Sequence, residues 1–403
     1  MRENEIPFNS DNIIDVDVHK KSPLKIILVI LGSLAIITYI LILIFSFTNV
    51  LPQEDHIDID NSTNYIKAIY KCNSHISYRY KFYDDENKNY SLLISSIIVD
   101  GENVSVTPYH EYSDCNEKNV EIKFKDKVEN LTYFFSTDFL ISVDFSKLDT
   151  SELNDMSYMF FHSSYLKSIT WGGNFSTSKV TMMDYLFYYC YSLTSLNLSI
   201  FKTPKVTTFS NMFYSCYSIK ELDLTSFDTS SATDLAYMFG ACTSLTSVDV
   251  SKFDTSKVVT MYGMFVDCKV LKSLDLSNFK TKALEDATMM FRNCEELVNI
   301  ENHFTSEKLK TAQDMLSECA NLRKIDLSGF VGEELTNVKF MFYDCYNLTL
   351  VDMSNFECGK CNETNGMFTK ILSSGTFIYN SSKINPKILE QIPEKWNKTD
   401  IKN

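Results

Sequence analysis

Seven cysteines recur at an almost constant interval and constrain the fold more than any other feature of this chain. The intervals are 26, 26, 26, 26, 25 and 26 residues. A fixed period of this length indicates a repeat architecture, in which each unit packs mainly against its two neighbours. The sequence therefore predicts a solenoid. The periodic cysteines are Cys190, Cys216, Cys242, Cys268, Cys294, Cys319 and Cys345.

Each cysteine closes a unit with two halves, and the copy from Leu222 to Cys242 illustrates both. Apolar residues alternate around Asp223 in the first half, which predicts a short β-strand with Leu222 and Leu224 pointing inward. In the second half apolar residues recur at three- and four-residue steps, which predicts one face of a helix. Because a single unit cannot bury its apolar face, about nine turns are expected to stack over residues 139–371 as an α/β solenoid of the leucine-rich-repeat type.

Two copies depart from the pattern, and both ends of the array need a cap. The second copy carries Trp171-Gly172-Gly173, and the seventh, near Ile300 to Phe304, is one residue short, so local irregularity is expected there. Residues 48–138 contain strand-like runs and are predicted to form a juxtamembrane linker and a small β-rich N-terminal cap, with a separate ligand-binding domain as the alternative. Residues 372–403 are predicted to form the C-terminal cap.

An uncharged, largely apolar run at residues 26–47 precedes the array. As a helix it spans about 33 Å, which is enough to cross a bilayer. Lysines precede the run and carboxylates follow it, so the positive-inside rule places residues 1–25 in the cytoplasm and the rest outside or in a lumen. The prediction is an uncleaved signal-anchor of a single-pass type II membrane protein at the cell surface; cleavage of the anchor would give a secreted form.

Acceptor motifs for N-glycosylation occur only after the apolar run, which agrees with this topology. They predict a glycoprotein if the host glycosylates. The acceptor asparagines are Asn61, Asn89, Asn103, Asn130, Asn174, Asn197, Asn347, Asn362, Asn380 and Asn397.

The repeat phrase from Leu274 to Phe279 resembles the BspA-like leucine-rich repeat surface proteins. The resemblance covers Leu140 to Ile371 and extends to Gly375-Thr376-Phe377 and to the segment from Gln391 to Trp396, which is similar to the closing segment of such arrays. It implies a cell-surface protein that binds matrix proteins, host cells or other microbes. It defines no binding residues.

A row of aspartates is the candidate binding site on the exposed side of the predicted sheet. Like charges stacked at strand spacing repel, so calcium, a basic partner, or local backbone hydrogen bonds with solvation must offset them. All three explanations stay open at this stage. The row consists of Asp223, Asp249, Asp275, Asp326 and Asp352.

Four cysteines outside the periodic row are candidates for disulfides. Cys72 and Cys115 both lie in the predicted N-terminal cap, and Cys358 and Cys361 form a lone CxxC pair. The periodic cysteines are expected to be buried thiols at the end of the apolar face, although disulfides between adjacent turns are geometrically feasible.

The remaining composition favours binding over catalysis. The net charge of −14 argues against nucleic acid as a partner, because phosphate binding needs a basic face. No Gly-rich phosphate loop, GxSxG or HExxH spacing is present, so we expect no enzyme activity, no metal and no cofactor. The expected function is protein–protein or cell adhesion through protein or glycan ligands. The alternative is a structural surface coat that acts by self-association.

Overall fold

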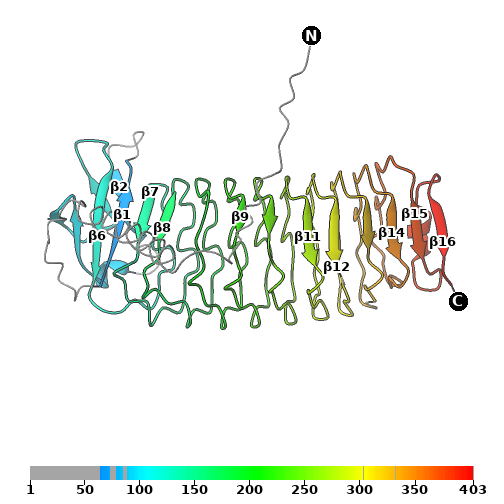
Figure 1. The fold of residues 1–403 in the computed structure, drawn as a ribbon, viewed down its shortest axis with the longest axis horizontal. Coiled ribbons are helices and arrows are strands. Elements are labelled where there is room, and N and C mark those ends of the chain that lie inside the picture. The colour runs from blue at the N-terminus through cyan, green and yellow to red at the C-terminus, as the bar shows by residue number, and fades with distance from the viewer. Residues whose placement is uncertain (1–63, 73–78, 85–88, 303, 332, 403) are drawn as a thin grey trace, which may run out of the picture. The chain divides into compact units, whose positions relative to one another are not determined.

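The computed structural model describes most of the chain after residue 63, and Figure 1 shows its backbone. The predicted cytoplasmic tail and signal-anchor helix lie outside the described residues. Within the described part, no helix is long and apolar enough to cross a membrane. The described residues are 64–72, 79–84, 89–302, 304–331 and 333–402.

The predicted solenoid is confirmed, with one short parallel strand in most turns. Leu222 and Leu224 point into the core and Asp223 is exposed, as the alternation predicts. Strand pairing is parallel but interrupted, and joins β7 to β8, β9 to β10, β11 to β12, and β13 through β16. The strands are β7 (Leu140–Asp144), β8 (Ser168–Thr170), β9 (Glu221–Leu222), β10 (Ser247–Val248), β11 (Ser273–Leu276), β12 (Asn299–Asn302), β13 (Lys324–Asp326), β14 (Leu350–Met353), β15 (Thr376–Tyr379) and β16 (Asn397–Asp400).

The predicted helix in each turn is wrong. The backbone that carries the three- and four-residue spacing is a chain of tight turns with a left-handed residue every fourth position, such as Tyr237 and Ala241. Alternate N–H groups donate to different places: Tyr237 donates to Tyr262 of the next turn, whereas Met238 donates to Leu235 of its own turn. Half of the backbone bonds thus link neighbouring turns, which an α-helix does not permit.

We call these ten-residue segments arcs, each beginning at a bridge to the next turn. The bridges form an unbroken parallel ladder of nine pairs from Asn130 to Glu363. Arcs 130–139, 155–164, 182–191, 208–217 and 234–243 are the N-terminal arcs. Arcs 260–269, 286–295, 311–320, 337–346 and 363–372 are the C-terminal arcs.

Columns of identical side chains fill the core beneath the arcs. Phenylalanine rings of successive turns stack with centroids 5.2 to 5.9 Å apart, from Phe135 to Phe291. A column of buried threonines runs beside them, and the Thr203 hydroxyl donates to the Asp228 carbonyl while it accepts from the Asp228 N–H, both at 2.8 Å. This threonine column satisfies backbone groups in the irregular segments that follow the strands.

A six-stranded sheet closes the N-terminal end of the solenoid (Figure 1). Its strand order is β4-β3-β6-β1-β7-β8, and β1 runs antiparallel to β7, so the cap sheet and the first turn are continuous. Asp100 and Gly101 have positive φ and form the tight turn between β3 and β4, as the turn signal indicates. The remaining elements are β1 (Tyr65–Tyr70), β2 (Arg79–Lys81), η1 (Tyr90–Leu92), β3 (Ile94–Val99), β4 (Glu102–Val104), β5 (Tyr109–Glu111) and β6 (Lys118–Phe124).

The C-terminal end is closed by the segment after the last arc. Strand β16 pairs in parallel with β15, and the one described α-helix, α2 (Pro386–Leu389), lies between them in sequence. Trp396 is buried against Phe368, with ring centroids 6.1 Å apart. The core is therefore covered at this end by the region predicted as a cap.

The two irregular copies are places where backbones of adjacent turns approach closely. A Cβ on Gly172 would lie 2.4 Å from Ser146 Cα, and one on Gly329 would lie 1.7 Å from the Phe304 carbonyl oxygen. The one-residue deletion of the seventh copy coincides with a gap in strand pairing, since β12 and β13 share no ladder.

Candidate binding surfaces

The aspartate row lies on the outward side of the strands, where each carboxylate caps its own backbone. Asp223 accepts a hydrogen bond from the Thr225 N–H at 3.0 Å and Asp249 accepts one from the Ser251 N–H at 2.9 Å. Asp275, Asp326 and Asp352 accept from the residue two positions later in the same way. Local backbone hydrogen bonds therefore account for the row.

These bonds favour the charged carboxylate. Hydrogen bonds from Thr225 lower the pKa of Asp223, and hydrogen bonds from Ser251 lower that of Asp249. In the described part of the chain, no group of three or more His, Cys, Asp or Glu side chains is placed to hold a metal ion.

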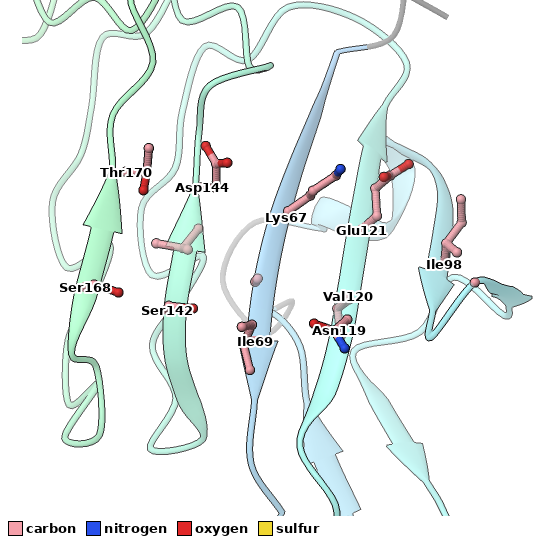
Figure 2. Close-up of a pocket in the computed structure, with 13 residues that line it drawn as sticks. Lys67, Ile69, Ile98, Asn119, Val120, Glu121, Ser142, Asp144, Ser168 and Thr170 are labelled. Carbon is pink, nitrogen blue, oxygen red and sulfur yellow. The ribbon is translucent and has the colours of Figure 1, made fainter. Parts of the chain in front are cut away.

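A hollow of about 500 Å³ lies where the cap sheet joins the first turns (Figure 2). Figure 2 shows Lys67 on β1 between Glu121 on β6 and Asp144 on β7, which are its register partners on the two sides. Asp144 accepts from the Ser146 N–H at 2.7 Å, the bond made by every member of the aspartate row. Asp144 therefore repeats the local geometry of the row, although the neutral Thr170 and Asn197 separate it from Asp223.

A second hollow of about 410 Å³ lies at the gap between β12 and β13. Glu301, Lys324, Asp326 and Asp352 line it, so three carboxylates and one cation face it. The strand face therefore offers an acidic row from Asp223 to Asp352, with one hollow beside Asp326 and Asp352 and another beside Asp144.

The periodic cysteines are buried thiols. All seven are free, and each donates a weak S–H hydrogen bond to a carbonyl of the preceding turn, as Cys242 does to Phe213 at 3.1 Å. Burial raises the pKa of Cys242 and of Cys319 to about 12. These thiols are therefore protonated and inert at neutral pH.

The other four cysteines are brought together in the predicted pairs. Cys72 and Cys115 form a disulfide with their Cα atoms 5.2 Å apart, and Cys358 and Cys361 form another at 5.1 Å.

The acceptor asparagines differ in exposure. Asn61 lies outside the described residues, and Asn130 and Asn380 are half-buried. The Asn130 amide also donates to Asp155 at 3.3 Å. The seven exposed asparagines are Asn89, Asn103, Asn174, Asn197, Asn347, Asn362 and Asn397.

Outward side chains of the N-terminal arcs form a surface that the sequence analysis missed. Nine tyrosines lie in these five arcs, against three in the C-terminal arcs. Six of them form three stacked pairs across neighbouring turns, with centroids 4.5, 5.1 and 4.8 Å apart, and Tyr133 of the first arc stacks on Tyr158 at 4.4 Å. We call these six the aromatic face: Tyr158 with Tyr185, Tyr188 with Tyr214, and Tyr191 with Tyr217. The signal in the sequence was the three-residue step of Tyr185, Tyr188 and Tyr191, which the sequence analysis did not single out.

The same positions of the C-terminal arcs carry ion pairs. Lys269 pairs with Glu295 at 2.8 Å, and Arg292 pairs with Glu318 at 3.0 Å. Such exposed pairs contribute little stability each. They neutralise part of the charge of the C-terminal arcs, which contain seven carboxylates and four cations. The same backbone thus presents stacked tyrosines in the N-terminal arcs and ion pairs in the C-terminal arcs.

Comparisons with known proteins match most of the solenoid to a family. The model described as "Mycoplasma protein of unknown function, DUF285" matches residues 108–221, 208–330 and 298–380, which together span more than half of the 403 residues. The family model that matches is therefore DUF285 and not the BspA-like proteins that the repeat phrase resembles. The part of that resemblance that is confirmed is the solenoid of the leucine-rich-repeat type. A comparison with curated proteins gives no match.

Two solved structures are similar over about two thirds of the chain. A leucine-rich cell surface protein from Faecalibacterium prausnitzii is 16% identical over 67% of this chain and 86% of its own, with a TM-score of 0.28. The TLR13–ssRNA13 complex is 17% identical over 68% of this chain and 35% of its own, with a TM-score of 0.29. Both TM-scores lie well below 0.5, so neither likeness carries a conclusion about function.

Proposed function

We propose that this chain, which belongs to the family described as "Mycoplasma protein of unknown function, DUF285", is a surface protein that binds other proteins or cells through its solenoid. The observation that carries the proposal is the contrast between inward and outward positions. Inward positions repeat the same side chains in almost every turn, whereas outward positions of the arcs change from tyrosines to ion pairs. A uniform core with variable outward side chains is the usual design of a solenoid that binds partners.

The proposal includes a membrane anchor at residues 26–47, with the solenoid outside, and a binding rather than a catalytic role. The apolar run and its flanking charges support the anchor, and the exposed acceptor asparagines support an extracellular or lumenal solenoid. Adhesion and a relationship to BspA-like surface proteins belong to the same proposal, and neither needs the aspartate row to bind calcium.

Binding of the full-length chain, reconstituted in liposomes, to matrix proteins, glycans and intact cells tests the function. We expect saturable binding to one of these classes, unchanged when calcium is chelated. Absence of binding to every class, together with concentration-dependent self-assembly, would instead favour the structural coat.

The anchor has its own test. The full-length chain is expected to remain with membranes after alkaline extraction, and deletion of residues 26–47 is expected to release it. Release of the intact chain by the same extraction would refute the anchor.

A further inference from the structure

The aromatic face carries the strongest unassigned feature of the molecule. Its tyrosines are half-buried or exposed, with Tyr217 40% exposed, so their rings lie at the surface and not in the core. Stacking between turns holds the rings in fixed positions, which lowers the entropy lost when a partner binds. Tyrosine is also among the residues that most often dominate binding energy at interfaces.

The charges around this face have one sign. The five N-terminal arcs contain no Lys or Arg, but they contain Asp138, Asp155, Asp184 and Asp234. Asp155 is buried, whereas Asp138 is exposed and Asp184 and Asp234 are half-buried. Asp184 accepts from the Ser157 hydroxyl at 2.7 Å and Asp138 from the Ser164 hydroxyl at 2.7 Å. Among the described residues, none of the four forms an ion pair with a cation of this chain.

The C-terminal arcs differ because they contain cations. They carry Lys269, Arg292, Lys339 and Lys370, and three of these cations pair with carboxylates of neighbouring arcs. The C-terminal arcs also contain seven carboxylates, so they remain acidic. What distinguishes the N-terminal arcs is that they contain no Lys or Arg of their own that could compete with a bound cation.

We infer that the aromatic face binds an arginine- or lysine-rich segment of a partner protein. The inference rests on the proposed function and names the partner's chemistry. Guanidinium and ammonium groups stack on tyrosine rings by cation–π attraction, and the adjacent carboxylates add charge complementarity. A second copy of this face is a poor partner, because it would bring six accessible carboxylates together without a Lys or Arg from either set of N-terminal arcs.

Binding of a fluorescent arginine- and glycine-containing peptide to the full-length chain in detergent micelles tests the inference. A glutamate- and glycine-containing peptide and a neutral glucan are the comparison probes. The basic peptide alone is expected to bind, with an affinity that falls as salt is added.

Two sets of variants locate the site. Tyr188→Leu with Tyr214→Leu keeps apolar volume but removes both rings of one stack, and Asp184→Asn removes one charge. Each set is expected to lower the affinity of the chain for the basic peptide by about fivefold or more. The control is Tyr343→Leu, at the arc position of Tyr188 and Tyr214, combined with Asp344→Asn, which removes a carboxylate from the same C-terminal arc. It is expected to leave binding unchanged. Thermal unfolding of every variant verifies that the fold is retained.

Three outcomes would overturn the inference: no binding of the basic peptide, equal binding of the glutamate peptide or the glucan, or equal loss in the control. Failure of the proposed function is separable from this, since it requires that the full-length chain bind no matrix protein, glycan or cell. A chain that binds such a target equally well with and without the aromatic-face substitutions keeps the proposed function and refutes the inference.

Discussion

The N-terminal and C-terminal arcs share one backbone and one core but present different surfaces. Tyr188 and Tyr214 stack at the seventh position of their arcs, and the same position three turns after Tyr214 is Arg292, which pairs with Glu318. Beneath both surfaces runs the same phenylalanine column. The difference teaches that turn-to-turn hydrogen bonds and inward side chains determine the fold, which leaves the outward positions free to encode partners.

The largest expected effect tests whether the core is truly the same under both halves. Phe213 and Phe265 are each fully buried between two stacked rings of neighbouring turns. Phe213→Ala and Phe265→Ala should each lower the free energy of unfolding by about 3–5 kcal/mol. Urea unfolding checks this, and a wild-type stability for either variant would mean that the halves differ in their cores.

The close backbone approaches provide the next test, with a matched control in the same loop. Gly172→Ala forces a Cβ against Ser146, so a loss of about 1–3 kcal/mol is expected. Gly173→Ala meets nothing within 4 Å and should change stability by less than about 0.5 kcal/mol. Gly329→Ala in the C-terminal half should behave like Gly172→Ala, because its Cβ would meet the Phe304 carbonyl. Equal effects of the two adjacent glycines would contradict this packing.

Salt should separate the two surfaces directly. Tyr188→Ala removes stacking on Tyr214 and Phe161, which is expected to cost about 0.5–1.5 kcal/mol beyond the lost burial. Arg292→Ala removes a partly exposed ion pair, which is expected to cost about 1 kcal/mol or less. Added salt should shrink only the second loss. Unfolding at low and high ionic strength measures both, and equal salt dependence would break the comparison.

The smallest effect is a difference in pH dependence between an arc and a strand carboxylate. Burial raises the folded pKa of Asp234, so its contribution to stability is present below the unfolded pKa and is lost as pH rises through the folded pKa. Hydrogen bonds from Ser251 lower the folded pKa of Asp249, so its contribution is present above the unfolded pKa and is lost as pH falls through the folded pKa.

Asp234→Asn and Asp249→Asn should therefore change the slope of stability against pH in opposite directions. Unfolding free energies of both variants and the parent chain between neutral and acid pH measure these slopes. If both substitutions changed the slope relative to the parent chain in the same direction, the environments of the two carboxylates would not be distinct.

The repeat period, the inward strand residues and the positions of the irregular copies were predictable from the sequence. The periodic cysteines and the alternation of Leu222 and Leu224 carry that information. The backbone of the arcs was not predictable from the sequence, because three- and four-residue apolar spacing arises both in a helix and in successive tight turns. Gly263 and Gly366, which occupy left-handed arc positions, were the available hint against a helix.

The candidate surfaces were predictable only in part. The position of Asp223 on the exposed strand face follows from alternation, and the Asp-x-Thr spacing to Thr225 explains why the row needs no external cation. The aromatic face did not follow, since the exposure of Tyr188 depends on arc geometry and not on a helical period. The absence of Lys and Arg from the N-terminal arcs can be seen in the sequence once the arc boundaries are known.

Amide hydrogen exchange of the full-length chain, with and without the basic peptide, tests the central claim most directly. The claim is that one uniform solenoid presents two surfaces, of which only the aromatic face binds the peptide. The predicted result is similar slow exchange in both sets of arcs without peptide, and added protection confined to the N-terminal arcs with it. Protection along the strand row from Asp223 to Asp352, or equally in the C-terminal arcs, would contradict the account.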